Sequence, residues 1–135
     1  MTRSTSILTG LLVFLVFLPL TGCSKGPPST VEGKVLVDGK PLEIGSIDFL
    51  PKDGKGPVSG GTITNGQYSV DLYPGEKTVS IVGQKFVREE KDPAMSTPRQ
   101  VYESVVPPRY NRKSELVAQI TDGDTVTQDF DLKSK

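Results

Sequence analysis

The side chain with the most distinctive chemistry in this 135-residue chain is Cys23, its single cysteine. A lone cysteine cannot form a disulfide within the chain. The chain has no histidine, so it lacks the side chain that most often serves as a general base or metal ligand near neutral pH. Neither a Ser/His nor a Cys/His catalytic pair can be assembled. We therefore expect a non-enzymatic protein with no catalytic residues, no metal site and no cofactor.

The residues before Cys23 follow the order of a secretory signal peptide. Arg3 supplies a short positive region, and residues 7–18 are apolar except for Thr9 and Gly10. An apolar run of this length is short for a membrane span, which needs about 20 residues. It suits the hydrophobic region of a signal peptide, which is followed by small residues at the cleavage site.

The string LTGC that ends at Cys23 resembles the lipobox of bacterial lipoproteins. The resemblance implies that the Cys23 thiol receives a diacylglycerol and that signal peptidase II removes residues 1–22. Ser24 stands where an aspartate would resemble the inner-membrane retention signal of some Gram-negative bacteria, so the outer membrane is favoured where one exists. The alternative is an ordinary signal anchor with an incidental cysteine.

The part of the chain from Cys23 onward is nearly neutral, because Arg3 is the only charged residue before it and the whole chain is balanced. Nucleic-acid binding depends on Lys and Arg that neutralise phosphates, so we expect no nucleic-acid partner. No polybasic patch is present for anionic lipid, so membrane attachment would depend on the acyl chains. Residues 24–30 are polar and rich in Pro and Gly, which predicts a flexible tether. With the lipidated Cys23 that the lipobox resemblance implies, the anchor and tether cover residues 23–30.

From Val31 the sequence alternates between apolar and polar residues, with frequent turn signals, and this pattern predicts an all-β domain. Asp38-Gly39 and Asn65-Gly66 are typical of hairpin turns. Phe49 and Phe130 fall on faces that should be buried. The pattern predicts seven strands, which begin near residues 31, 46, 62, 68, 78, 116 and 126.

Residues 85–108 interrupt this alternation with four prolines and a charge cluster that starts at Arg88. We interpret them as a long excursion without regular strand, and such loops often carry binding residues. The alternative to a binding role for the excursion is that it is an inert insertion. For Tyr110, the alternative to a binding role is that its side chain packs against the edge of the core. The candidate contact surface consists of basic and aromatic residues in and just after the segment, namely Arg88, Lys91, Arg99, Tyr102, Arg109 and Tyr110.

Residues 31–132 resemble a known β-sandwich family. The opening VEGKVLVDGKPLEIGSIDFLP and the middle TNGQYSVDLYPGEKTVSI are similar to carboxypeptidase regulatory-like, or transthyretin-like, domains. The end, VPPRYNRKSELVAQITDGDTVTQDFDL, resembles that of small lipoproteins with this domain in planctomycete-like bacteria. The resemblance implies a seven-strand Greek-key β-sandwich over residues 31–135 and says little about function. A related hydrolase, the hydroxyisourate hydrolase, uses histidines and a C-terminal Tyr-Arg-Gly-Ser motif, and this chain has neither.

Acidic residues near the C-terminus allow two other interpretations. Asp122, Asp124, Asp129 and Asp131 suggest calcium, but calcium needs six to eight converging oxygens and the spacing does not match an EF-hand loop. A Lys–Asp isopeptide bond would need inward-facing partners. Lys34, Asp129 and Asp131 all alternate with apolar neighbours, so we expect them to face outward.

These observations together predict a lipid-anchored, non-enzymatic protein of the cell envelope that acts as a binding or structural module. Its expected partners are the membrane, through the N-terminal lipid, and an envelope protein or polysaccharide. The alternative is a carbohydrate- or peptide-binding surface protein with a defined ligand. Sugar binding usually needs exposed aromatic side chains, and without tryptophan the candidates are Tyr73, Tyr102 and Tyr110.

Overall fold

The computed structural model describes residues 28–123 and 125–135. The strands of the first part are β1 (Ser29–Val37), β2 (Lys40–Pro41), β3 (Ile44–Pro51), β4 (Ser59–Thr64) and β5 (Gln67–Leu72). The second part contains β6 (Gly75–Glu90), β7 (Arg99–Ser104), the 3-10 helix η1 (Pro108–Tyr110), β8 (Leu116–Ile120), β9 (Val126–Thr127) and β10 (Phe130–Leu132). Each of the seven predicted strands is present. The predicted signal peptide, Cys23 and residues 24–27 of the tether lie outside the described residues. The prediction that the tether extends to residue 30 is wrong, because Ser29 and Thr30 already belong to β1.

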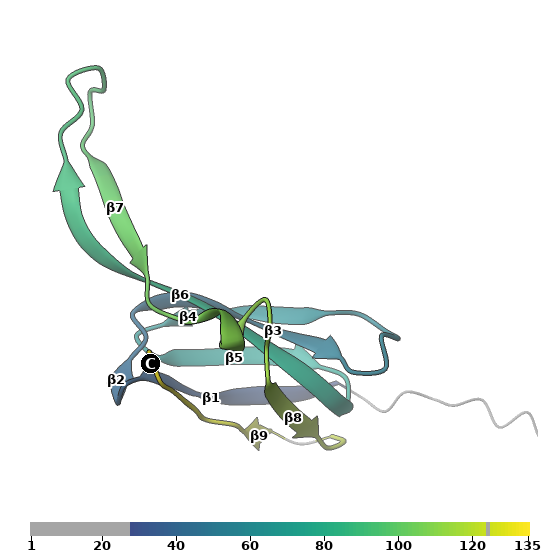
Figure 1. Cartoon of the computed structure of the whole chain (residues 1–135). Helices are drawn as coiled ribbons and strands as arrows, with labels where there is room; N and C mark the ends of the chain where they lie inside the picture. The colour runs from purple at the N-terminus through teal and green to yellow at the C-terminus, as the bar shows by residue number, and fades with distance from the viewer. Residues whose placement is uncertain (1–27, 124) are drawn as a thin grey trace, which may run out of the picture.

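The strands form a curled sheet in the order β10-β1-β5-β4-β3-β6-β7, and the chain is an all-β sandwich (Figure 1). β8 lies beside β6, whereas β2 and β9 lie beside β1. Most pairs are antiparallel, but β9 and β10 run parallel to β1. The inward-facing apolar residues form one core, which is made of Val31, Val35, Leu42, Ile47, Phe49, Ile63, Tyr68, Val70, Leu72, Val79, Ile81, Val106, Ala118, Ile120, Phe130 and Leu132.

The two predicted hairpin turns have the backbone that their residues favour. Asp38 and Gly39 have φ angles of 51° and 77°, and Asn65 and Gly66 have φ angles of 50° and 76°. A two-residue turn with positive φ at both positions matches the right-handed twist of the flanking strands. Asn and Asp tolerate this conformation better than other non-glycine residues.

Tyr68 is a buried residue of the core and packs near two other aromatic rings. Its ring centroid lies 6.2 Å from that of Phe49 and 6.3 Å from that of Phe130. Its hydroxyl donates a 2.7 Å hydrogen bond to the carbonyl of Gln128, which satisfies the buried polar group. The predicted burial of Phe49 and Phe130 is confirmed.

The last predicted strand is divided into β9 and β10 because the chain passes very close to β1 at Gly33. A Cβ atom at Gly33 would lie 1.9 Å from the Gln128 carbonyl oxygen, so only glycine fits. Gln128 N donates to Glu32 O at 2.8 Å, and Lys34 N donates to the Asp129 carboxylate at 2.7 Å. The Asp129 side chain thus replaces one backbone acceptor of the ladder.

The prediction of an irregular excursion over residues 85–108 is wrong for half of its length, residues 85–90 and 99–104, which form strands. β6 continues to Glu90 and pairs with β7, so the segment is a hairpin that projects from the sandwich (Figure 1). Pro93 and Pro98 lie in the tip between the two strands, where neither interrupts the ladder. We call residues 84–104 the arm.

The alternation that reveals a strand in sequence requires one buried face, and the arm has none. Every arm residue except Glu90 and Val101 is exposed, and those two are half-buried. A register shift between Phe86 and Arg88 also changes the face on which successive residues lie. The sequence of the arm therefore lacks a strand pattern although its backbone is regular.

Candidate contact surfaces

The structure separates the six predicted contact residues into two groups. Arg88, Lys91, Arg99 and Tyr102 belong to the arm, with Lys91 at the start of its tip. Arg109 and Tyr110 belong to η1, on the body of the sandwich. The two groups come from different surfaces, so the predicted set is not one continuous site.

Arg109 and Tyr110 are occupied in holding the C-terminal segment. The Arg109 guanidinium donates to the carbonyls of Lys133 and Lys135, the latter at 2.9 Å, and lies 4.8 Å from the centre of the Tyr110 ring. Lys133 N donates to the Tyr110 hydroxyl at 3.3 Å, and Tyr110 is half-buried against the core. Hydrogen bonding with the Arg109 side chain, and then with the backbone of Lys133, lowers the pKa of Tyr110. The alternative in which Tyr110 packs against the core edge is confirmed.

One face of the arm carries charges of alternating sign. The Glu90 carboxylate accepts from Arg88 at 2.6 Å and from Arg99 at 3.0 Å, while Lys85 lies 3.8 Å from Glu103. These hydrogen bonds, first from Arg88 and then from Arg99, lower the pKa of Glu90. Because the side chains are exposed, each pair stabilises the hairpin only weakly.

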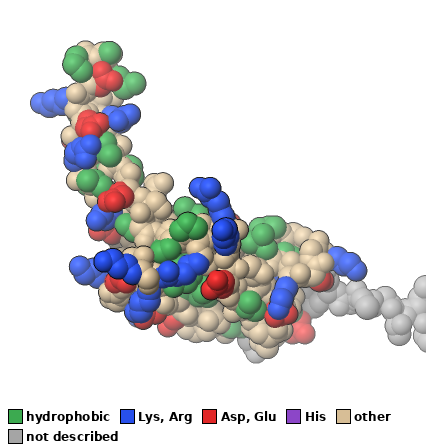
Figure 2. Space-filling view, viewed as in Figure 1, with side chains coloured by type: hydrophobic (Ala, Val, Ile, Leu, Met, Phe, Trp, Pro, Cys, Tyr) green, Lys and Arg blue, Asp and Glu red, His purple; other side chains and the backbone are tan. Residues whose placement is uncertain are grey.

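The other face of the arm carries two aromatic rings. Phe86 and Tyr102 face each other across β6 and β7, with centroids 6.0 Å apart and planes at 73°. Both rings are exposed to solvent, as are Val87 and Met95. In Figure 2, apolar side chains and charges of both signs are interspersed along the arm. The arm is thus a narrow ribbon with apolar contact area and no strong net charge.

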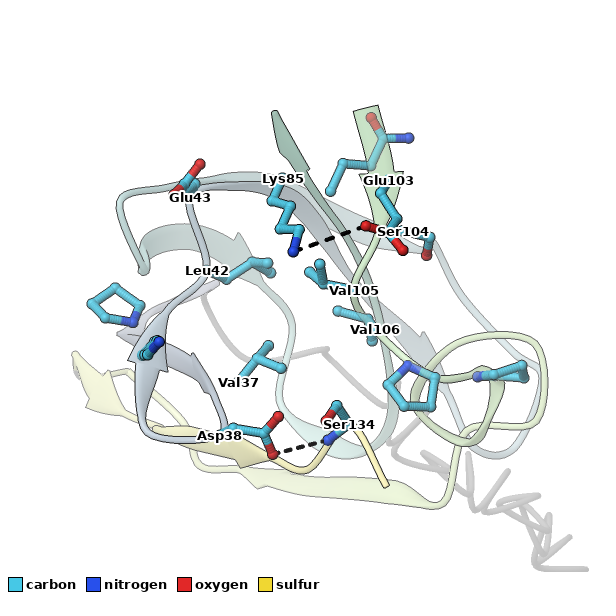
Figure 3. Close-up of a pocket in the computed structure, with 15 residues that line it drawn as sticks. Val37, Asp38, Leu42, Glu43, Lys85, Glu103, Ser104, Val105, Val106 and Ser134 are labelled. Atoms are coloured by element: carbon cyan, nitrogen blue, oxygen red, sulfur yellow. Dashed lines mark hydrogen bonds and ion pairs between the residues drawn. The ribbon is translucent and has the colours of Figure 1, made fainter. Parts of the chain in front are cut away.

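A groove lies where the arm joins the body (Figure 3). Its volume is about 730 Å³, and its apolar floor comes from Val37, Leu42, Val105 and Val106. Lys85 and Glu103 form one side of it. Sequence reasoning missed this groove because its residues come from distant segments that the curled sheet brings together.

On the opposite side of the groove, Asp38 accepts a 3.1 Å hydrogen bond from the backbone of Ser134. Hydrogen bonding to Ser134, through its side chain and then its backbone, lowers the pKa of Asp38. The Asp38 carboxylate therefore closes the turn between β1 and β2 against the C-terminal segment. It orders the wall of the groove and is already engaged there.

Two of the acidic residues near the C-terminus, Asp129 and Asp131, have structural partners. Asp129 accepts from Lys34 N, and Asp131 lies 3.1 Å from the Lys133 ammonium. Lys34, Asp129 and Asp131 are exposed, as predicted, so they are not inward-facing isopeptide partners. Within residues 28–123 and 125–135, no group of three or more His, Cys, Asp and Glu side chains is placed to hold a metal ion. The same residues include no helix with the length and apolar character of a membrane span.

Comparison with known proteins gives little further information. Neither a family model nor a curated protein matches the chain. Among solved structures, the chain is similar to a 9R-lipoxygenase from Cyanothece PCC8801, with 12% identity and a TM-score of 0.39. The match covers 98% of this chain and 18% of that one, so the chain spans a small part of the enzyme's length. A likeness this weak carries no argument about function.

Proposed function

We propose that this protein is a non-enzymatic lipoprotein of the cell envelope, which uses its arm as the contact surface for an envelope partner. The observation that carries the proposal is the arm itself. It extends a two-stranded ribbon with an exposed ring pair away from the sandwich, and none of the core residues belongs to it. A two-stranded hairpin is marginally stable alone in water. Exposed aromatic and Arg side chains of this kind are enriched in protein contacts.

The membrane attachment is supported by the sequence. The LTGC string follows an apolar run of signal-peptide length, and Cys23 is the only cysteine in the chain. One acyl chain gives only reversible membrane binding, whereas the two or three chains of a mature lipoprotein anchor stably. The absence of an aspartate at position 24 favours the outer membrane where there is one.

A second candidate function is peptide binding in the groove at the base of the arm. The groove has an apolar floor of Leu42 and Val106 with charged residues at its rim, which suits an extended peptide better than a sugar. The aromatic candidates for sugar binding lie apart from one another: Tyr73 follows β5, Tyr102 is on the arm and Tyr110 is on η1. Carbohydrate binding through a shared aromatic platform is therefore the weaker alternative.

Two experiments on the full chain in its native envelope test the proposal. Cys23→Ala should abolish incorporation of radiolabelled palmitate and leave the precursor uncleaved; palmitate in the mutant would refute the anchor. For the arm, a photo-crosslinking amino acid replaces Met95, which is 60% exposed, or Val58 on the body, which is 58% exposed. We expect a discrete adduct from position 95 and none from position 58. Equal labelling at both positions would show that the arm is not a contact surface.

A further inference from the structure

The outer edge of β7 is an unpaired strand edge. Among the described residues β7 pairs only with β6 and ends the sheet. Val105 N donates to Gly83 O at 3.1 Å, so the backbone polar groups of Val105 face β6. Hydrogen bonding alternates along an antiparallel strand, and the bulge lies on β6, so β7 alternates without interruption. The N–H and C=O groups of Gln100 and Tyr102 therefore point outward, away from β6.

This edge is complementary to itself. When two copies of β7 meet antiparallel about a two-fold axis at Val101, Gln100 of each copy stands opposite Tyr102 of the other. These are the residues whose backbone groups point outward, so the hydrogen bonds can form. The same register places Arg99 of each copy opposite Glu103 of the other, on the face that carries Val101. Both charged side chains are about two-thirds exposed, at 67% and 65%.

The ion pairs within each arm extend this complementarity across four strands. Lys85 already lies opposite Glu103, and Glu90 lies opposite Arg99. When two arms join in this register, each row begins with Lys85 and Glu103 of one copy. It continues across the new contact to Arg99 and then Glu90 of the other copy. Charges alternate along each row, and opposite charges across neighbouring strands are favourable.

We propose that the arm partner is a second copy of this chain, joined edge to edge along β7 to form a four-stranded sheet with two-fold symmetry. This inference rests on the proposed function of the arm as a contact surface. Exposed edges are usually protected by charged side chains, which repel another edge when they share one sign, or by a proline within the strand. Here the centre of the edge is Val101 and Tyr102, Pro98 lies just outside it, and its flanking charges have opposite signs. Pairing also converts two marginal hairpins into a sheet large enough to be stable.

Disulfide trapping in the envelope tests the register. The proposed axis places the two Val101 Cα atoms about 4.5 Å apart, within the range that a disulfide spans. Under a mild oxidant, Val101→Cys should give a product of twice the chain mass on a non-reducing gel. The matched control is Val117→Cys, which introduces a cysteine at a 50% exposed valine of β8. The unsubstituted chain, with Cys23 alone, controls for disulfides through that residue.

Charge reversal tests the partner. In the Val101→Cys background, Arg99→Glu should weaken self-association roughly tenfold, because both symmetry-related pairs become repulsive. A chain with Glu103→Arg should likewise pair poorly with itself, because Arg99 of each copy then faces the introduced arginine of the other. Mixing this chain with the Arg99→Glu chain should restore most of the dimer, because both contacts between the two different copies again join opposite charges, which a merely damaged arm would not achieve. The inference is overturned if Val101→Cys dimerises no better than Val117→Cys, or if the mixture of the two charge variants forms no more dimer than either variant alone. An arm adduct that contains another envelope protein would refute the second copy and leave the proposed function standing; no adduct of any kind would refute both.

Discussion

The Phe86 and Tyr102 rings meet edge to face across the two strands of the arm, with their centroids 6.0 Å apart. This contact lies outside the core, and both rings remain exposed. An aromatic pair of this geometry contributes about 0.5–1.5 kcal/mol beyond the area it buries. The arm is thus held by local pairs across its own strands, and its opening need not disturb the sandwich.

Phe86→Ala should therefore loosen the arm without unfolding the domain. We expect backbone amides of β7 to exchange with deuterium several-fold faster, whereas amides of β1 and β3 keep their protection. Hydrogen exchange read by mass spectrometry checks this. Val117→Ala, at an exposed position on β8, is the control and should leave the arm unchanged. Uniform acceleration in the arm and the core together would contradict the local role of the ring pair.

Truncation of core phenylalanines should have a much larger effect on global stability. Phe49 is 1% exposed and contacts Tyr68 from β3. Phe49→Ala should lower the free energy of unfolding by about 3–5 kcal/mol, because it leaves a cavity in a packed core. Phe86→Ala removes the same atoms from an exposed site and should cost less than about 1 kcal/mol. Denaturant titration measures both, and a similar loss in the two variants would place Phe86 in the core as well.

The sequence predicts the body of the fold well because the sandwich has one buried face. Val31 and Val35, or Tyr68 and Val70, alternate with exposed residues and are buried as predicted. The Asn65-Gly66 turn is equally local in origin. The split between β9 and β10 could not be predicted, since it depends on the close approach of Gly33 to Gln128, which are far apart in the chain.

The arm and the groove were beyond prediction for different physical reasons. The arm has no buried face, so its sequence shows charges and prolines where its backbone forms strands. Arg88, Arg99 and Tyr102 were identified by residue type, but their pairing with Glu90 and Phe86 depends on a register that no local pattern specifies. The groove depends on tertiary contact between the β1–β2 turn and Val106.

Removing the outer part of the arm should leave the sandwich intact. No residue of the core cluster lies between residues 88 and 100, so a short Gly/Ser linker in their place removes no buried contact. Changing the length of a flexible connection costs little. We expect a midpoint of thermal unfolding within a few degrees of the unmodified protein. Circular dichroism on heating measures it, and a large drop would show that the arm contributes to the stability of the core.

Tyr68→Phe should be destabilising near neutral pH but less so in alkali. The substitution leaves the Gln128 carbonyl without its 2.7 Å donor, which should cost about 1–2 kcal/mol. Burial, and then the Asp129 charge, raise the pKa of Tyr68 from its usual value of 10.0. The folded state thus favours the protonated phenol, and this stability is present below pH 10 and is lost as the pH rises further. The difference between the two proteins in denaturant titrations should shrink above pH 10; a constant difference would contradict the raised pKa.

Acid should open the arm before it unfolds the sandwich. Arg88 and Arg99 lower the pKa of Glu90 below its usual value of 4.5, so the folded arm favours the carboxylate. The stabilisation is therefore present above pH 4.5 and is lost as the pH falls through the lower folded pKa. Glu90→Gln should accelerate amide exchange in β7 at pH 6, and its difference from the unmodified protein should vanish in strong acid.

Glu89→Gln is the matched control, because Glu89 stands opposite Gln100 on the other face of the arm. Since the pairs are exposed, added salt should reduce the effect of Glu90→Gln at pH 6. Equal effects of the two substitutions would show that loss of charge, and not the Glu90 ion pairs, opens the arm.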